Sequence, residues 1–286
     1  MSPRVTAFFD SDTCTITYAV AEPDGDHAAI VDSVLDFDAA SGRTATRSAD
    51  KLIAFVKDQG LVVDWILETH AHADHLTAAP YLQETLGGKI AIGAGIVDVQ
   101  QIFAALYNIE DVVSGEGSEF DRLLAEGDRI EIGGMTLEVL ATPGHTPACA
   151  TYLVGDAAFT GDTIFMPDFG SARCDFPNGS AAELYRSIRR ILSLPDKTRI
   201  FVGHDYAPGE RDYAWETTVA AERSDNIHVH DGIDEAAFVE MRTARDATLS
   251  APGLLLPAIQ VNIRAGRLPE PEANGIAYMK LPINAF

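Results

Sequence analysis

Four side chains of types that commonly bind metal ions lie within the seven residues THAHADH, at positions 69–75. They are His70, His72, Asp74 and His75, and the whole chain contains only eight histidines. Imidazole nitrogens and carboxylate oxygens bind zinc and iron in proteins. The apolar run 61–69 predicts a buried strand, and if the chain stays extended beyond it, His70 and His72 project to the same side. We therefore expect a metal centre here, and the number and kind of its ions would separate a hydrolase from an oxygenase.

Three further residues of the same chemical types each follow another apolar run. His145 follows the Pro-Gly turn of ATPGHTPA, Asp162 follows the run in FTGDTIF, and His204 follows the run in IFVGHDY. Each alone fits an ordinary turn residue. Sites in α/β proteins, however, commonly form where strands end and loops begin. The joint pattern therefore predicts that these three side chains join the four of residues 69–75.

Three residues near these positions are candidates for contact with a substrate or for reactivity. The planar guanidinium of Arg173 could bind an anionic group or form a surface salt bridge. Tyr206 could donate a hydrogen bond to a substrate or pack in the interior. Cys174, in the turn-rich stretch FGSARCDFPNG, could be a reactive thiol or a buried structural residue. The remaining histidines lack a comparable context and are expected at the surface or in a second domain: His27, His228 and His230.

The elements that must position these residues follow from the hydrophobic pattern and the turn residues. Strands or hairpins are expected at 13–20, 27–35, 61–69, 89–93, 128–142, 148–162 and 198–206. Helices are expected at 48–60, 75–88, 95–107, 183–194, 212–223 and 234–249, and residues 115–128 are expected to form an irregular connection. Asp74 and His75 would then lie at the start of the helix 75–88, at the positive end of its dipole. Pro80 within that helix indicates a kink.

One domain spanning residues 1–286, with sheets covered by helices, is the simplest architecture for this pattern. Residues 226–286 are expected to be a C-terminal extension that packs on the body. The stretch PGLLLPAIQVNI within it is too apolar to remain in solvent.

Composition narrows the range of partners. The formal net charge of −22 disfavours nucleic acid and an anionic membrane as partners. No apolar run approaches the ~20 residues of a membrane-spanning helix. The N-terminal residues lack the features of a secretory signal, so a cytoplasmic location is expected. The three cysteines have neither the number nor the spacing of a disulfide framework or a C-x-x-C site.

The motifs THAHADH, TPGHT, TGD and GHDY, in this order and spacing, resemble the metallo-β-lactamase superfamily. The resemblance implies an α/β fold, the αβ/βα sandwich, in which two mixed sheets face each other and helices flank them. Within the superfamily, TPGHTPACATYLVGDAAFTGDTIF, ARCDF and VGHDY look like the persulfide dioxygenase (ETHE1-like) branch. The long C-terminal tail looks like a bacterial subgroup of that branch.

This resemblance implies a sulfur dioxygenase that oxidises glutathione persulfide with O2 to sulfite and glutathione. One Fe(II) per chain would be held by His70, His145 and Asp162, a set of two histidines and one carboxylate that suits non-haem iron. Arg173 matches the family's arginine before a short D-F pair and would contact the substrate, and Tyr206 stays the candidate for a hydrogen bond to the substrate named above. The other four residues would support the site as neighbours of the ligands: His72, Asp74, His75 and His204. A homodimer or a larger homo-oligomer is also implied.

Two other functions remain open at this point. A hydrolase of the same fold, such as a glyoxalase II-like thioesterase or a lactonase, would use two zinc ions and a metal-bound hydroxide. One ion would then be held by His70, His72 and His145, the other by Asp74, His75 and His204, with Asp162 between them. A non-catalytic metal-responsive protein is the third possibility.

The segment 164–172 looks longer than in mitochondrial-type members, which would reshape the substrate pocket.

Overall fold

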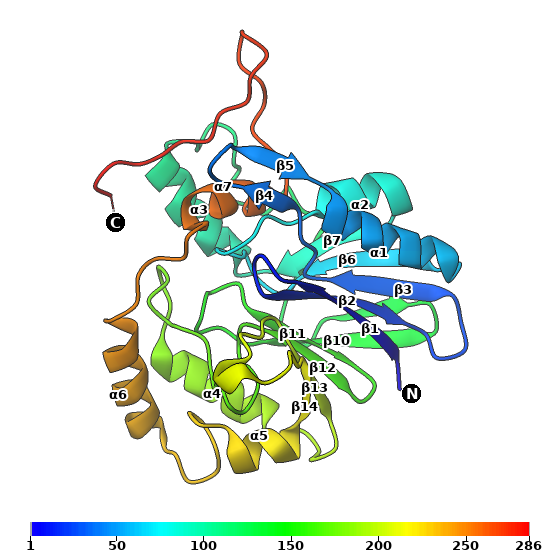
Figure 1. The fold of residues 1–286 in the computed structure, drawn as a ribbon, viewed down its shortest axis with the longest axis vertical. Coiled ribbons are helices and arrows are strands. Elements are labelled where there is room, and N and C mark those ends of the chain that lie inside the picture. The colour runs from blue at the N-terminus through cyan, green and yellow to red at the C-terminus, as the bar shows by residue number, and fades with distance from the viewer. Residues whose placement is uncertain (1, 286) are drawn as a thin grey trace.

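Two six-stranded mixed sheets lie face to face in the computed structural model, which describes residues 2–285 (Figure 1). The first sheet has the strand order β1-β2-β3-β6-β7-β8. Its strands are β1 (Arg4–Asp10), β2 (Thr15–Ala21), β3 (His27–Val31), β6 (Val62–Glu68), β7 (Lys89–Gly93) and β8 (Arg122–Leu124). β1, β2 and β3 pair antiparallel, whereas β3, β6, β7 and β8 pair parallel.

The second sheet is built from the later part of the chain in the order β14-β13-β12-β11-β10-β9. Its strands are β9 (Arg129–Ile132), β10 (Met135–Ala141), β11 (Ala150–Val154), β12 (Ala157–Gly161), β13 (Arg199–Val202) and β14 (Glu216–Thr218). Only β12 and β13 pair parallel, and the other neighbours are antiparallel. A separate two-stranded hairpin joins β4 (Asp36–Asp38) to β5 (Arg43–Ala45).

Helices cover the outer faces of both sheets, with α1–α3 and α7 on one side and α4–α6 on the other (Figure 1). They are α1 (Arg47–Asp58), α2 (Ala79–Leu86), α3 (Ile96–Tyr107), α4 (Ala181–Ile191), α5 (Val219–Asp225), α6 (Glu235–Asp246) and α7 (Leu255–Asn262), with a short 3-10 helix η1 at Pro208–Glu210. Neighbouring residues of β6 point to opposite sides, so Ile66 packs under the helices and Leu67 packs between the sheets. The αβ/βα sandwich expected from the motifs is confirmed.

The expected helix 75–88 begins later than the sequence pattern indicated. α2 starts at Ala79, with Pro80 in its first turn, where proline fits because no backbone donor is needed. Pro80 therefore opens the helix and does not kink it. Asp74 and His75 lie in the preceding loop, so the prediction that they sit at the helix N-terminus was wrong.

Two other local predictions also differ from the structure. Residues 115–128 contain the strand β8, and the segment 212–223 contains β14 before α5 begins at Val219. These short strands lie at sheet edges and carry too few residues for a clear period of two.

The apolar stretch near the C-terminus forms the helix α7, and the chain after Gly266 runs out as a largely exposed arm (red in Figure 1). Among the described residues, no helix is both long enough and apolar enough to span a bilayer.

Candidate metal centre

All seven ligand-type residues predicted from the sequence converge at one edge of the sandwich, where four strands end. The loop after β6 carries the residues of the THAHADH motif, and the loops after β10, β12 and β13 each add one more residue. The strands bring together parts of the chain far apart in sequence because neighbouring strands end at a common edge. The side chains brought together are His70, His72, Asp74, His75, His145, Asp162 and His204.

The first of two clusters consists of His70, His145 and Asp162, whose candidate ligand atoms all lie within 4.8 Å of one another. One carboxylate oxygen, Oδ2 of Asp162, lies 3.9 Å from Nε2 of His70 and 3.8 Å from Nε2 of His145. All three side chains are buried, so water screens them poorly. Two imidazoles and one carboxylate therefore face a common point.

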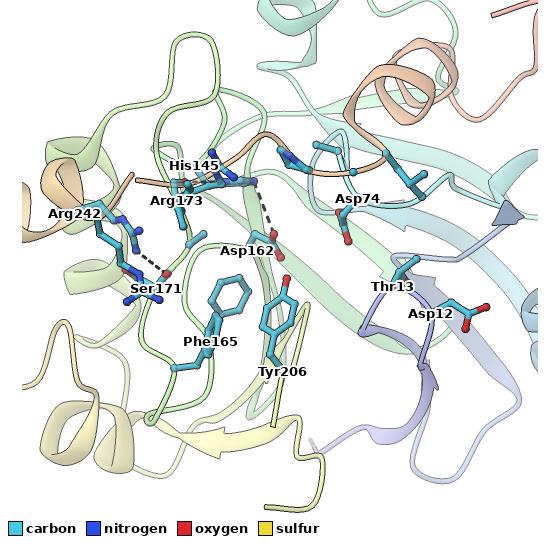
Figure 2. Close-up of a pocket in the computed structure, with 18 residues that line it drawn as sticks. Asp12, Thr13, Asp74, His145, Asp162, Phe165, Ser171, Arg173, Tyr206 and Arg242 are labelled. Atoms are coloured by element: carbon cyan, nitrogen blue, oxygen red, sulfur yellow. Dashed lines mark hydrogen bonds and ion pairs between the residues drawn. The ribbon is translucent and has the colours of Figure 1, made fainter. Parts of the chain in front are cut away.

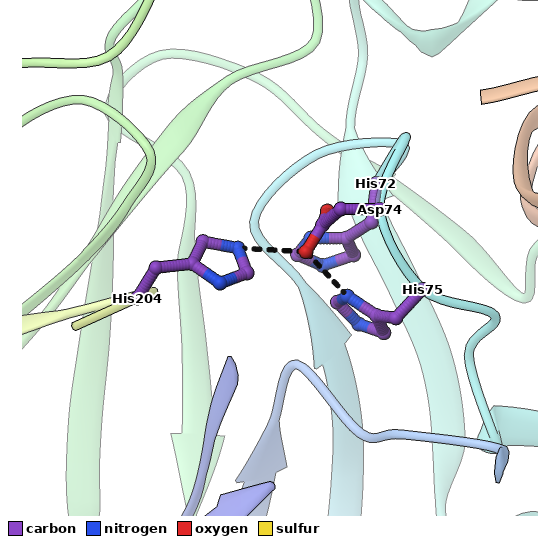
Figure 3. Close-up of side chains that lie close together, drawn as sticks. All are labelled: His72, Asp74, His75 and His204. Atoms are coloured by element: carbon purple, nitrogen blue, oxygen red, sulfur yellow. Dashed lines mark hydrogen bonds and ion pairs between the residues drawn. The ribbon is translucent and has the colours of Figure 1, made fainter. Parts of the chain in front are cut away.

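The second cluster consists of His72, Asp74, His75 and His204, again within 4.8 Å of one another (Figure 3). Oδ2 of Asp74 lies 3.3 Å from Nε2 of His204 and 3.5 Å from Nδ1 of His75. The other carboxylate oxygen of Asp162, Oδ1, lies 3.4 Å from Nε2 of His204. Asp162 thus has one oxygen toward each cluster.

Hydrogen bonds on the far side of two imidazoles leave the ligand nitrogens free. Nδ1 of His145 donates to the backbone carbonyl of Arg173 at 2.7 Å, so its Nε2 carries a lone pair toward Asp162. The Thr69 hydroxyl donates to Asp32 at 2.8 Å, so the same oxygen accepts from Nδ1 of His70 at 3.1 Å. His70 is thereby also held with its Nε2 unprotonated.

The residues present fit a bound metal ion. Five buried ligand-type atoms have no hydrogen-bond partner within the described part of the chain: Nε2 of His70, Nδ1 of His72, Nε2 of His75, Oδ1 of Asp162 and Nε2 of His204. A buried polar atom without a partner costs about 1–3 kcal/mol, so five in one place would be strongly destabilising. Coordination of a cation satisfies such atoms, and their chemistry is that of iron and zinc ligands.

Two buried carboxylates beside the centre were missed by the sequence analysis. Nε2 of His72 lies 3.0 Å from Oδ1 of Asp32 and 3.3 Å from Oε2 of Glu68. Burial disfavours a charged imidazole, but these two carboxylates outweigh it and raise the pKa of His72 well above its usual value. With Nε2 held by the carboxylates, Nδ1 of His72 is turned toward the clusters. The available signal was an acidic residue within or directly after a buried apolar run, in HAAIVDS and WILETH.

A cleft of about 480 Å³ opens onto the centre. His145, Asp162 and Asp74 line its floor, and Phe165, Phe169 and Tyr206 form an aromatic wall (Figure 2). The rings of Phe169 and Tyr206 lie 4.7 Å apart, so Tyr206 packs while it lines the cleft. The segment 164–172, which looked long in the sequence, supplies both phenylalanines. Residues of α6 and of the segment after it also line the cleft, including Arg242, Arg245 and Leu254.

Residues 13–204 match the protein-family model described as the metallo-beta-lactamase superfamily. The chain belongs to this superfamily. The matched segment contains every candidate ligand, and the ligand-type cluster together with membership of the superfamily supports a metal cofactor and an enzymatic role.

Curated relatives within the superfamily carry two kinds of name. The chain is 53% identical to a probable metallo-hydrolase of Burkholderia pseudomallei, over 99% of both chains. It is 48% identical to glyoxylase B2 of Dictyostelium discoideum, over 98% of this chain and 97% of that one. It is also 33% identical to the mitochondrial persulfide dioxygenase ETHE1 of Mus musculus, over 69% of this chain and 66% of that one.

A solved structure described as ETHE1 from Myxococcus xanthus has a TM-score of 0.74 and 29% sequence identity, covering 92% of this chain and 100% of that one. This likeness and the ETHE1 relative support the ETHE1-like branch of the metallo-β-lactamase superfamily, as the motifs predicted.

The side chain of Arg173 is already engaged within the protein. Its Nε donates to Asp175 at 2.6 Å, Nη2 donates to the same carboxylate, and Nη1 donates to the carbonyl of Ser250 at 2.7 Å. Arg242 is likewise paired with Asp246. Arg245 differs from both, because it is exposed and no carboxylate of residues 2–285 lies within 4.0 Å of its guanidinium.

Cys174 and His228 are both buried in this metallo-β-lactamase fold. Cys174 packs in the cluster between the second sheet and its helices, and burial raises the pKa of its thiol to about 12. A thiolate is the reactive form, so these properties favour a structural role. His228 accepts a hydrogen bond from the backbone of Ser171 at 3.0 Å. His228 therefore does not lie at the surface, which was one of the two places expected for it.

Proposed function

We propose that the chain is a persulfide dioxygenase that oxidises glutathione persulfide with O2 to sulfite and glutathione. One Fe(II) per chain would be held by His70, His145 and Asp162. The observation that carries the proposal is which residues line the cleft: two of these three, His145 and Asp162, do so, whereas of the other four ligand-type residues only Asp74 does. A substrate in the cleft therefore lies beside an imidazole and the carboxylate of this cluster.

When bound, Fe(II) would offer open positions to the sulfur of the substrate and to O2, and would pass electrons from that sulfur to O2. The chain's own residues hold the ligands. The Arg173 carbonyl orients His145, and the Thr69 hydroxyl orients His70. His204 places Nε2 between Asp74 and Asp162, at 3.3 and 3.4 Å. Burial opposes a charged imidazole, but the charges of Asp162 and Asp74 raise the pKa of His204, so a protonated His204 can balance both carboxylates without a second ion.

The walls of the cleft suit a thiol carrier with a charged tail. Phe165, Phe169 and Tyr206 give the cleft an aromatic wall beside the ligands. Arg245, the arginine of the cleft wall without an ion pair in residues 2–285, is available for a carboxylate of the substrate. In a chain with a formal net charge of −22, such a local cation is needed to attract an anionic substrate.

The experiment is to purify the protein without oxygen, measure its metals, and follow O2 uptake with glutathione persulfide. The proposal predicts one iron per chain and O2 consumption that depends on the persulfide. Two zinc ions per chain, with thioester hydrolysis and no O2 uptake, would overturn it.

A binuclear hydrolase, such as a glyoxalase II-like thioesterase or a lactonase, is the second candidate. Two observations favour it: Asp162 has one oxygen toward each cluster, and the relatives with the higher identities reported above are named metallo-hydrolase and glyoxylase. Both clusters would then hold zinc, and the metals would supply a hydroxide nucleophile. The same metal and O2 measurements separate the two functions.

A further inference from the structure

We propose that Asn262, in the C-terminal extension (residues 226–286), is a positioning residue of the metal centre. Its role is to hold the loop 69–78, which carries four of the seven ligand-type residues. Asn262 lies beyond the family match, which ends at residue 204, and no sequence motif marked it. The inference rests on the metal centre proposed above, but not on the identity of the metal or on the reaction.

The side-chain amide of Asn262 makes its hydrogen bonds to this one loop. Nδ2 donates to the backbone carbonyls of His72 and His75, both at 2.8 Å. Oδ1 accepts from the backbone N–H of Thr77 at 3.0 Å. Asn262 is only 3% exposed, so these bonds do not compete with bulk water. Both amide hydrogens and the amide oxygen are thus used within six residues of the loop.

The loop depends on these bonds because it has little regular structure of its own. It runs from the end of β6 at Glu68 to the start of α2 at Ala79. In residues 2–285, no backbone N–H donates to the carbonyl of His72 or His75. Buried carbonyls require a partner, so without Asn262 both would be left unsatisfied directly beside ligand side chains. The loop would then shift toward water, and the imidazoles would move with it.

Asn262 is itself held on a rigid support. It is the last residue of α7, and Leu255, Ile259 and Ile263 of this segment pack in the core cluster that includes α3 (Figure 1). Nε2 of Gln100, in α3, also donates to the carbonyl of Ile263 at 2.8 Å. Because the core holds α7 in place, the side chain of Asn262 can in turn hold the loop 69–78 in place.

The same extension also forms hydrogen bonds with the loop on the other side of the metal centre, which contains Ser171 and Cys174. Asp246 accepts from the backbone N–H of Cys174 at 2.8 Å, and Arg242 donates to the carbonyl of Ser171 at 3.2 Å. This loop includes Arg173, whose carbonyl orients His145. The extension therefore holds ligand-bearing or ligand-orienting loops from both sheets, and Asn262 makes the side-chain hydrogen bonds to the THAHADH loop.

Cobalt(II) loaded into the full-length protein tests the proposal, because its visible absorption reports ligand geometry whatever the native metal. The variants are Asn262→Ala and Asn262→Asp, where Asp keeps the volume and the acceptor for Thr77 but loses both donors. Gln260→Ala is the matched control, since Gln260 is equally buried on α7 but donates to Leu256 and Lys280, away from the loop.

The expected result is a changed cobalt spectrum and roughly 10–100-fold weaker cobalt binding against a chelator in both Asn262 variants, with wild-type behaviour in Gln260→Ala. Circular dichroism verifies folding, and if Asn262→Ala does not fold, Asn262→Asp decides. A folded Asn262 variant with wild-type spectrum and affinity would overturn the proposal, as would an equal loss in Gln260→Ala. If the wild-type protein binds cobalt normally but its iron form takes up no O2 with glutathione persulfide, only the dioxygenase function would be contradicted.

Discussion

Nδ1 of His145 donates a hydrogen bond of 2.7 Å to the backbone carbonyl oxygen of Arg173. Arg173 therefore acts on the candidate metal centre through its backbone, while its guanidinium is occupied by Asp175 and Ser250. This relationship suggests a positioning role for a residue whose side chain was expected to bind substrate. The two roles predict different kinetic results.

Replacing Arg173 with alanine should weaken metal binding by up to about 10-fold, because the loop that orients His145 loses the hydrogen bonds of the guanidinium to Asp175 and Ser250. The KM for substrate should stay nearly unchanged. The informative partner is Asp175→Asn, which breaks the same ion pair but keeps the arginine. If the pair is structural, both variants lose metal affinity. A higher KM in Arg173→Ala together with a lower KM in Asp175→Asn would instead support direct substrate binding.

Arg245→Ala should raise the KM for glutathione persulfide by roughly 10- to 100-fold at constant kcat, since one charge-assisted hydrogen bond is worth about 1.5–3 kcal/mol. The KM for the persulfide of 2-mercaptoethanol, which has no carboxylate, should not change. Arg43→Ala is the control, because Arg43 is also exposed and without an ion pair in residues 2–285 but lines a neighbouring cleft. Equal effects on both substrates would rule out recognition of the carboxylate by Arg245.

His75→Ala separates one metal ion from two. His75 belongs to the second cluster and does not line the cleft over the first. The dioxygenase proposal predicts that this variant keeps its iron, whereas His145→Ala and Asp162→Ala lose it. Metal content by mass spectrometry is the measurement. A wild-type protein with two ions that loses one of them in His75→Ala would point to the binuclear hydrolase.

Glu222 should make the protein less stable as the pH rises from about 4.5 to 8. Burial raises the pKa of Glu222 to about 8, although Asn226 donates to its carboxyl group. The folded state therefore keeps a proton that the unfolded state releases above its ordinary pKa, and this contribution to stability is lost as the pH rises. Glu222→Gln mimics the protonated form.

Urea unfolding at several pH values checks this prediction. The free energy of unfolding of Glu222→Gln, minus that of the wild type, should grow by roughly 4 kcal/mol between pH 4.5 and pH 8. Glu240→Gln, at an exposed position of α6, should show no such trend. A difference that stays constant with pH would mean that Glu222 is ionised in the folded protein.

The sequence by itself indicated the set of candidate ligands, because those signals are local, and the resemblance of its motifs to a known superfamily implied the fold. The ligand-type residues come where apolar runs end, and sites in α/β proteins commonly form where strands end, so convergence could be expected before any coordinates. Element boundaries were less certain. Pro80 was expected to kink a helix that it in fact opens, because proline suits the first turn as well as it disrupts the interior.

Only the tertiary structure decided what surrounds those ligands. Asn262 bonds the carbonyl of His72 from 190 residues away, and His72 meets Asp32 from 40 residues away. Such partners depend on which buried polar groups lie side by side in the packed core. The hydrophobic periodicity of the sequence carries no information about these contacts. The engagement of Arg173 by Asp175 and the unpaired state of Arg245 within residues 2–285 are likewise properties of the packed chain. A residue's type and spacing show that it can bind a metal or an anion, whereas its neighbours in space decide whether its atoms are free to do so.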